Sequence, residues 1–180
     1  MAELTPLWTQ KPTRDTEAIT AFLAERDITY ERRDLPDNVV AIAAKSRLTD
    51  EEKSEVLETF QAHLERLASD SGYVDADLIA IRSDFDGIDE ALAKFDKVHY
   101  HDDDEVRAIV GGQGVFGFIG DDGRQFLLLV EAGDYISVPK GMWHWFYCDD
   151  EKNITAIRLF RDTSGWVPHY RSTERGLASS

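Results

Sequence analysis

The spacing of hydrophobic and polar positions changes about halfway along the chain. Residues 13–27 and 49–68 carry apolar side chains three and four positions apart, the spacing that places them on one face of a helix. Thr49 and Glu52 also form a capping-box pattern at the start of the second of these segments. These patterns predict amphipathic helices in the first half of the chain.

The segments around these helices have shorter patterns. Residues 28–33 alternate between apolar and polar side chains, which predicts a short strand, and the sequence Pro-Asp-Asn at 36–38 is expected to end it. Residues 74–82 are ambiguous, but the alternation near their end favours a strand. A short helix fits residues 88–95.

After Lys97 the pattern becomes that of an all-β protein. Short apolar or alternating runs are separated by turn sequences such as GGQG at 111–114, and they cover residues 106–110, 115–119, 125–130, 135–138, 144–148 and 154–160. Strands at such regular spacing predict a sandwich or barrel, with the early helices packed outside it. We expect one domain over residues 1–180, with a helical part to about residue 94 and a barrel core at about 95–168.

Composition and charge narrow the classes of partner. The chain has 180 residues, of which 42% are hydrophobic, so it can bury a core as one domain. Its net charge of -15 argues against nucleic acid and anionic membrane surfaces as partners, because both attract basic patches. The longest apolar run, at 126–130, is too short to span a membrane.

Cysteine content and the N-terminus bear on the compartment. Cys148 is the single cysteine, so an internal disulfide is impossible, which fits a reducing compartment. The first residues lack the basic region and apolar core of a signal peptide. We therefore expect a cytoplasmic protein.

One stretch, FDKVHYHDDDEVRAIVGG at residues 95–112, concentrates groups that bind metals. His99 and His101 share a face of an extended chain, and Glu105 follows after three aspartates that are expected to bend it. His144 is the candidate for a fourth ligand. The alternative is that these are ordinary surface groups, but three of only five histidines fall into this arrangement. Imidazole and carboxylate together suit Fe, Ni, Mn, Co or Zn.

Two longer patterns resemble the motifs of the cupin superfamily. Residues 99–112 read His-x-His-x3-Glu-x6-Gly, which resembles the first cupin motif. Residues 133–144 read Gly-x5-Pro-x-Gly-x2-His, which resembles the second. Cys148 stands where an asparagine often ends the second motif, a position that is not a ligand. The resemblance implies a mainly β fold, a cupin-type double-stranded β-helix or jelly-roll barrel.

Within the cupins, the chain resembles the acireductone dioxygenases of bacterial methionine salvage over nearly its whole length. The segments that carry this resemblance are HYHDDDEVRAIVGGQGVF, DYISVPKGMWHWF, and AIRLF followed by GWV. The resemblance implies one Fe(II) or Ni(II) ion per monomer, bound by His99, His101, Glu105 and His144 with two water sites left open. It also implies a monomer whose substrates are acireductone and dioxygen.

The same resemblance implies a reaction. The substrate, 1,2-dihydroxy-3-keto-5-methylthiopentene, is an acidic enediol whose adjacent oxygens can chelate a metal ion. In this family the Fe(II) form yields 2-keto-4-methylthiobutyrate and formate. The Ni(II) form can instead yield 3-methylthiopropionate, formate and carbon monoxide.

Other side chains are candidates for substrate contacts. Arg107 shares the ligand-facing parity and is expected to stabilise negative charge, although a salt bridge to a nearby aspartate is the alternative. Arg158 is a second candidate, for which a structural role is equally plausible. By resemblance, Phe95, Phe146 and Trp166 are candidates for a pocket around the methylthio tail, with ordinary core packing as the alternative.

Two other functions compete with this interpretation. One is a different cupin metalloenzyme, such as a sugar isomerase or a dioxygenase for another enediol. The other is a cupin that binds a small ligand without catalysis, a class that usually tolerates loss of metal ligands. Here all four ligand positions are filled, which favours an enzyme, and the metal content of the purified protein would test this.

Overall fold

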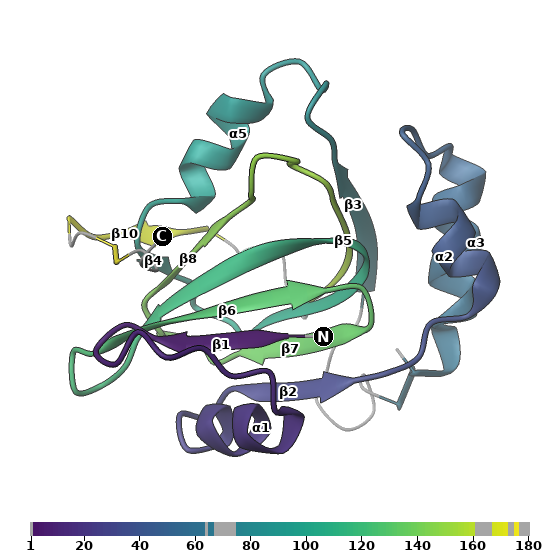
Figure 1. The fold of residues 1–180 in the computed structure, drawn as a ribbon. Coiled ribbons are helices and arrows are strands. Elements are labelled where there is room, and N and C mark those ends of the chain that lie inside the picture. The colour runs from purple at the N-terminus through teal and green to yellow at the C-terminus, as the bar shows by residue number, and fades with distance from the viewer. Residues whose placement is uncertain (1, 64, 67–74, 161–166, 173–174, 177–180) are drawn as a thin grey trace.

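One long strand, β5 (Glu105–Ile119), takes part in both β-sheets of this computed structural model (Figure 1). Its first half pairs with β7 (Asp134–Val138) and β9 (Ile154–Phe160). Its second half pairs with β6 (Gln125–Glu131) and β8 (His144–Tyr147). All of these pairings are antiparallel, as in the predicted barrel. The structure describes residues 2–63, 65–66, 75–160, 167–172 and 175–176.

The N-terminal part contributes strands as well as helices. β1 (Glu3–Pro6) pairs with β6, β2 (Thr29–Arg32) with β7, and β3 (Asp75–Ile81) with β9. Each sheet is therefore extended by segments that precede residue 95, and the description of this part as helical is too narrow. Two short strands, β4 (His99–Tyr100) and the C-terminal β10 (His169–Tyr170), pair with each other.

β5 continues through the GGQG sequence without interruption, so the turn predicted at 111–114 is wrong. The register against β9 shifts between Ile109 and Gly111, which marks a bulge. Gly112 follows with a φ of 66°, and a Cβ there would lie 1.9 Å from the carbonyl oxygen of Asn153. Glycine at this position lets the strand bend from one sheet into the other without ending.

The helices lie outside the sheets, as predicted (Figure 1). Their bounds are α1 (Thr16–Ala24), α2 (Asp37–Ala43), α3 (Asp50–Thr59) and α5 (Ile88–Phe95). The capping box predicted from Thr49 and Glu52 is present at the start of α3. No helix in the described ranges is long and apolar enough to cross a membrane.

Two helix predictions need correction. The helix predicted over 49–68 is interrupted, because α3 ends at Thr59 and Phe60 forms its C-cap, while residues 61–63 and 65–66 are again helical. Leu64 and residues 67–68 lie outside the described residues. α2 was not predicted, since Pro36 was interpreted as the end of a strand, whereas it is the N-cap of this helix.

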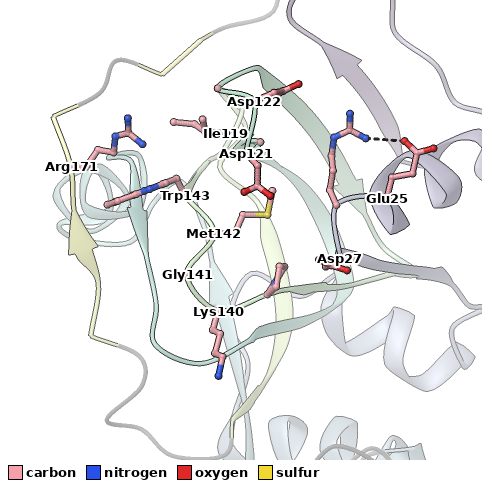
Figure 2. Close-up of a pocket in the computed structure, with 14 residues that line it drawn as sticks. Glu25, Asp27, Ile119, Asp121, Asp122, Lys140, Gly141, Met142, Trp143 and Arg171 are labelled. Atoms are coloured by element: carbon pink, nitrogen blue, oxygen red, sulfur yellow. Dashed lines mark ion pairs between the residues drawn. The ribbon is translucent and has the colours of Figure 1, made fainter.

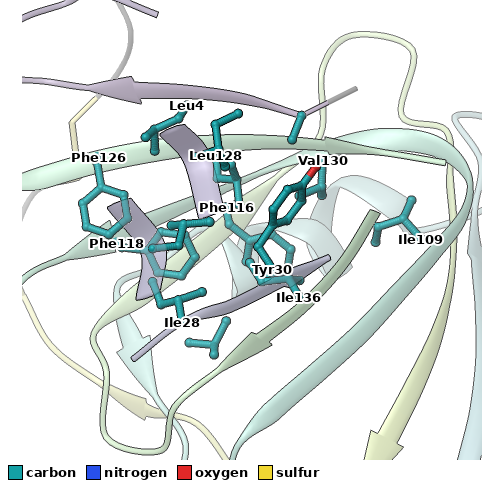
Figure 3. Close-up of a cluster of buried hydrophobic side chains, with 14 of the residues drawn as sticks. Leu4, Ile28, Tyr30, Ile109, Phe116, Phe118, Phe126, Leu128, Val130 and Ile136 are labelled. Atoms are coloured by element: carbon teal, nitrogen blue, oxygen red, sulfur yellow. The ribbon is translucent and has the colours of Figure 1, made fainter. Parts of the chain in front are cut away.

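The main apolar cluster fills the space enclosed by the sheets (Figure 3). Its larger members are Leu4, Ile28, Tyr30, Ile109, Phe116, Phe118, Phe126, Leu128, Val130 and Ile136. A second cluster packs α2 and α3 against the outer face of the sheet that contains β3, β5 and β9. It includes Val39, Val56, Leu78, Val110 and Ile157. Successive residues of one strand, such as Ile109 and Val110, belong to different clusters. We call the face that carries the main cluster the inner face.

Candidate metal centre

Four side chains from both cupin-like motifs meet at one end of the barrel. His99 is the first residue of β4, and His101 is the residue directly after the end of this strand. Glu105 is the first residue of β5, and His144 is the first residue of β8. β4 and β8 are paired so that His99 lies opposite His144. This single strand pairing brings together segments that are far apart in the sequence.

The ligand atoms of these residues converge. Each residue offers one ligand atom, and these atoms all lie within 4.8 Å of one another. The ring centroid of His99 lies 5.0 Å from that of His101 and 4.5 Å from that of His144. His99 and His144 are buried, and the side chains of Glu105 and His101 keep only 11% and 13% of their exposure. The cluster is therefore compact and largely shielded from water.

Backbone carbonyls orient two of the imidazole rings. Nδ1 of His99 lies 2.6 Å from the carbonyl oxygen of Lys97, and Nδ1 of His144 lies 2.8 Å from that of Met142. Because a carbonyl oxygen can only accept, Nδ1 must donate in both contacts. The Nε2 atoms are thereby left with their lone pairs for the centre of the cluster, the tautomer that a metal ligand needs.

A further contact tests whether a metal ion fits. Nε2 of His144 lies 2.6 Å from Oε2 of Glu105. With Nδ1 already donating, two atoms that both carry lone pairs face each other here, an arrangement that a shared cation stabilises. Burial, together with the nearby His144, lowers the pKa of His99 to about 4, which keeps this imidazole neutral at neutral pH. Neutral imidazoles beside a carboxylate fit a divalent metal ion.

Glu105 is held in its ionised form. Burial alone would raise the pKa of this carboxyl, but Arg107 and His144 outweigh that effect and hold the pKa well below its usual range. Nη2 of Arg107 lies 2.7 Å from Oε1, so one carboxylate oxygen is bound by the arginine. The other oxygen faces the histidines. The carboxylate thus links Arg107 to the metal site.

Three of the other candidate residues lie on β8, α5 and β9. Phe146 shares the strand face of His144, two residues earlier, and packs 5.0 Å from the ring of Phe116 in the main apolar cluster. Phe95 ends α5 and is 41% exposed. Arg158 forms an ion pair with Asp77. Trp166 lies outside the described residues.

The sequence did not predict the C-terminal strand β10, which pairs with β4, the strand that carries His99. Nε2 of His169, which carries no recognisable motif, lies 2.7 Å from Oδ2 of Asp102. The ring of His169 stacks on Tyr100 with centroids 4.6 Å apart, and Tyr170 lies 5.9 Å from His99. No local sequence pattern predicts these contacts, because they depend on the pairing between β4 and β10.

Two hollows lie near the cluster. A small cavity is lined by His101, Asp103, Asp104, Glu105 and Arg107, so it opens directly onto two of the ligands. A broader pocket of about 800 Å³ lies between the turns after α1, β5 and β7 (Figure 2). Met142 and Trp143 line the broad pocket, but none of the four ligands does. Of these two hollows, only the small cavity borders the metal site.

Comparisons with known proteins cover nearly the whole chain. The model of the ARD/ARD' family matches residues 10–168. The chain is 47% identical over 159 residues to an acireductone dioxygenase of Leptospira interrogans, covering 88% of this chain and 89% of the relative. It is 43% identical over 161 residues to that of Geobacillus kaustophilus, covering 88% and 89%.

A solved structure gives the same result for the fold. Acireductone dioxygenase from Bacillus anthracis, with a cadmium ion in its active centre, superposes with a TM-score of 0.88 at 36% identity. The match covers 94% of this chain and 98% of that one. It confirms the mainly β, cupin-type fold that the motifs predicted.

Proposed function

The chain belongs to the ARD/ARD' family, and we propose that His99, His101, Glu105 and His144 hold its one catalytic metal ion, Fe(II) or Ni(II). The protein is an acireductone dioxygenase, which cleaves acireductone with dioxygen in methionine salvage. The observation that carries the metal assignment is the convergence of four ligand atoms within 4.8 Å. Acireductone and dioxygen are its small-molecule partners.

The metal ion and Arg107 would each supply positive charge for binding the anionic substrate. When bound, the divalent ion supplies Lewis acidity to the two adjacent oxygens of the enediol. Arg107, which pairs with the carboxylate of Glu105 at the metal site, adds a positive charge that would stabilise the anionic enediolate. This local charge counts because the protein as a whole carries a net charge of -15, which repels anions at long range.

The apolar side chains near His144 suit the methylthio tail. Phe146 continues the strand face of His144 towards Phe116 and the main apolar cluster. A thioether packs well against aromatic rings, so this wall favours the sulfur end of the substrate. Phe95 and Trp166 remain candidates for contacts with the methylthio tail.

The metal determines which products we expect. We infer that the Fe(II) form yields 2-keto-4-methylthiobutyrate and formate. We expect the Ni(II) form to yield 3-methylthiopropionate, formate and carbon monoxide. Both ions suit a set of imidazole and carboxylate ligands, so the same four residues serve either reaction.

The decisive experiment is turnover by protein that has been stripped of metal and reloaded separately with Fe(II) and Ni(II). Acireductone is mixed with each form under air, and keto acid, formate and carbon monoxide are quantified. His144→Ala, treated identically, is the control for adventitious metal. Loss of acireductone without metal, or no loss at full metal occupancy, would contradict the proposal. The second result would favour another cupin metalloenzyme, such as a sugar isomerase or a dioxygenase for a different enediol.

The chain is also proposed to act as a monomer with one domain and one metal ion. Light scattering and metal analysis of the same sample test this directly. A dimer mass, or a metal content far from one ion per chain, would contradict it.

A further inference from the structure

A row of charged side chains leads from the metal ligands to the edge of one sheet. On β5, Arg107 follows Glu105 by two residues. In the pairing of β5 with β9, Arg107 lies opposite Arg158. In the pairing of β9 with β3, Arg158 lies opposite Asp77. Residues directly opposite each other across paired strands are near neighbours, so these four residues form one continuous row.

The row lies on the inner face of the sheet, which also carries the metal site. Two residues further along β5 and β3, Ile109 and Ile79 pack in the main apolar cluster. On β9, Ala156 occupies the equivalent position in that cluster. The residues between them, such as Leu78 and Ile157, pack under the outer helices instead. Since side chains alternate along a strand, the charged row faces inward.

The contacts at the far end of the row are specific. Nε of Arg158 donates to Oδ1 of Asp77 at 2.7 Å, and Nη2 donates to Oδ2 at 2.5 Å. Such a two-point contact fixes the plane of a guanidinium group as well as its position. The exposed fraction of the side chains rises from 10% at Arg107 to 26% at Arg158 and 42% at Asp77. Asp77 therefore holds Arg158 from the solvent side.

Two like charges are neighbours in the middle of the row, between two acids. Arg107 and Arg158 carry the same charge on neighbouring strands, so each disfavours the other. Arg107 forms an ion pair with Glu105, and Arg158 forms one with Asp77. An acid at each end of the row thus offsets the repulsion between the two guanidinium groups in the middle.

We propose that Asp77 is a positioning residue that holds the guanidinium group of Arg158 beside Arg107, so that both cations face the anionic substrate. The proposal rests on the proposed function, because acireductone supplies the anion. Asp77 contacts Arg158 through both of its carboxylate oxygens. It acts through Arg158.

Kinetics of three variants test this role. Asp77→Asn removes the charge at constant shape, Asp77→Glu restores it, and Asp75→Asn is the matched control on the same face of β3. We expect Asp77→Asn to lower kcat/KM for acireductone about tenfold, the usual scale for a residue that orients another. The loss should lie mainly in KM, because the substrate is already anionic when it binds. Metal content and thermal midpoint should stay at wild-type values, and Asp77→Glu should recover most of the loss.

A double-mutant cycle tests whether the effect passes through Arg158. If it does, adding Asp77→Asn to Arg158→Met should cost nothing beyond Arg158→Met alone. Additive losses would show that Asp77 acts independently and would overturn the proposal. A kcat/KM for Asp77→Asn within about twofold of wild type would also overturn it.

A spectroscopic measurement separates this inference from the proposed function. In 15N-labelled protein, the Nε–H signal of Arg158 is identified by its absence from Arg158→Met. We expect it to shift in Asp77→Asn and to stay in place in Asp75→Asn. If the wild-type protein failed to consume acireductone, the proposed function would fall, whereas an unchanged Nε–H signal would overturn the inference about Asp77.

Discussion

The two halves of β5 occupy the same barrel interior but serve it in opposite ways. The first half carries Glu105 and Arg107 to the metal site, whereas the second carries Phe116 and Phe118 into the main apolar cluster. Both halves are shielded from water, since Phe118 is fully buried and Arg107 is only 8% exposed. The difference between them lies in the partners of each side chain rather than in the depth of burial.

Two acidic groups show how partners decide the outcome of burial. Burial raises the pKa of the Cys148 thiol to about 11, because it packs against the apolar cluster and the nearby Asp149 adds to the effect. Burial acts in the same direction on Glu105, yet Arg107 and His144 reverse it. The same barrel thus keeps one acid protonated and another ionised.

Two buried arginines make the same point for cations. Arg82 donates hydrogen bonds to the carbonyl oxygens of Ala43, Lys45 and Ile154 and to Oγ1 of Thr155, which ties the end of α2 to β3 and β9. Arg107 instead pairs with a carboxylate that faces the metal site. Arg82 is therefore expected to support the fold, and Arg107 the reaction.

The largest effect is expected from removing the charge of the one carboxylate in the cluster. Glu105→Gln should lower acireductone turnover by about a thousandfold or more, because a neutral amide binds a divalent ion far more weakly than a carboxylate does. Metal analysis and product assays measure this loss. Circular dichroism of the variant should match wild type, since the apolar half of β5 is untouched. Unchanged metal content would contradict the assignment of Glu105.

The next largest effect separates the two arginines. Arg82→Met should lower the free energy of unfolding by about 2–4 kcal/mol, because several buried acceptors lose their donor. Urea denaturation measures the change. Arg47→Met, which removes an exposed pair with Asp84, should alter stability little. If Arg82→Met reduced kcat/KM of the folded enzyme as strongly as Arg107→Met, the contrast between the two arginines would fail.

A smaller effect tests the packing of the apolar half. A Cβ at Gly117 would lie 1.9 Å from the Trp145 ring, so Gly117→Ala should destabilise the protein by about 1–3 kcal/mol through overpacking. Thermal or urea unfolding measures this. Metal bound per folded chain serves as the internal control and should remain at the wild-type value. Loss of metal without loss of stability would contradict the separation of the two halves.

At neutral pH the smallest effect comes from Cys148, because its contribution to the pH dependence of stability is confined to pH values above about 9. The thiol of Cys148 ionises at about 11 in the folded chain and near 9.0 in an unfolded one. The unfolded state therefore loses its proton first, and stability falls as pH rises from about 9 to 11. Cys148→Ala should remove this part of the fall, measured as urea midpoints at both ends of the range. Identical slopes in the two proteins would contradict it.

The sequence by itself determined the local features of this protein. The capping box followed from the residue types of Thr49 and Glu52, and most strands followed from the period of the apolar residues. The helix at 88–95 was also predicted. The spacing of His99, His101 and Glu105 also pointed to a metal site, because these residues lie close together in the chain. The two motifs and the family resemblance then supplied the fold and agreed with His144 as the candidate for the fourth ligand.

Only the tertiary structure decided the features that depend on pairing between distant segments. Arg158 and Asp77 are separated by 81 positions, and His169 and Asp102 by 67. The passage of β5 through GGQG also depends on partners, because β9 and β6 accept its two halves on different sheets. Period and propensity specify the face of one element, whereas register specifies which residues of two elements meet. For that reason the sequence could predict the four candidate ligands, but it could not predict the charged row beside them.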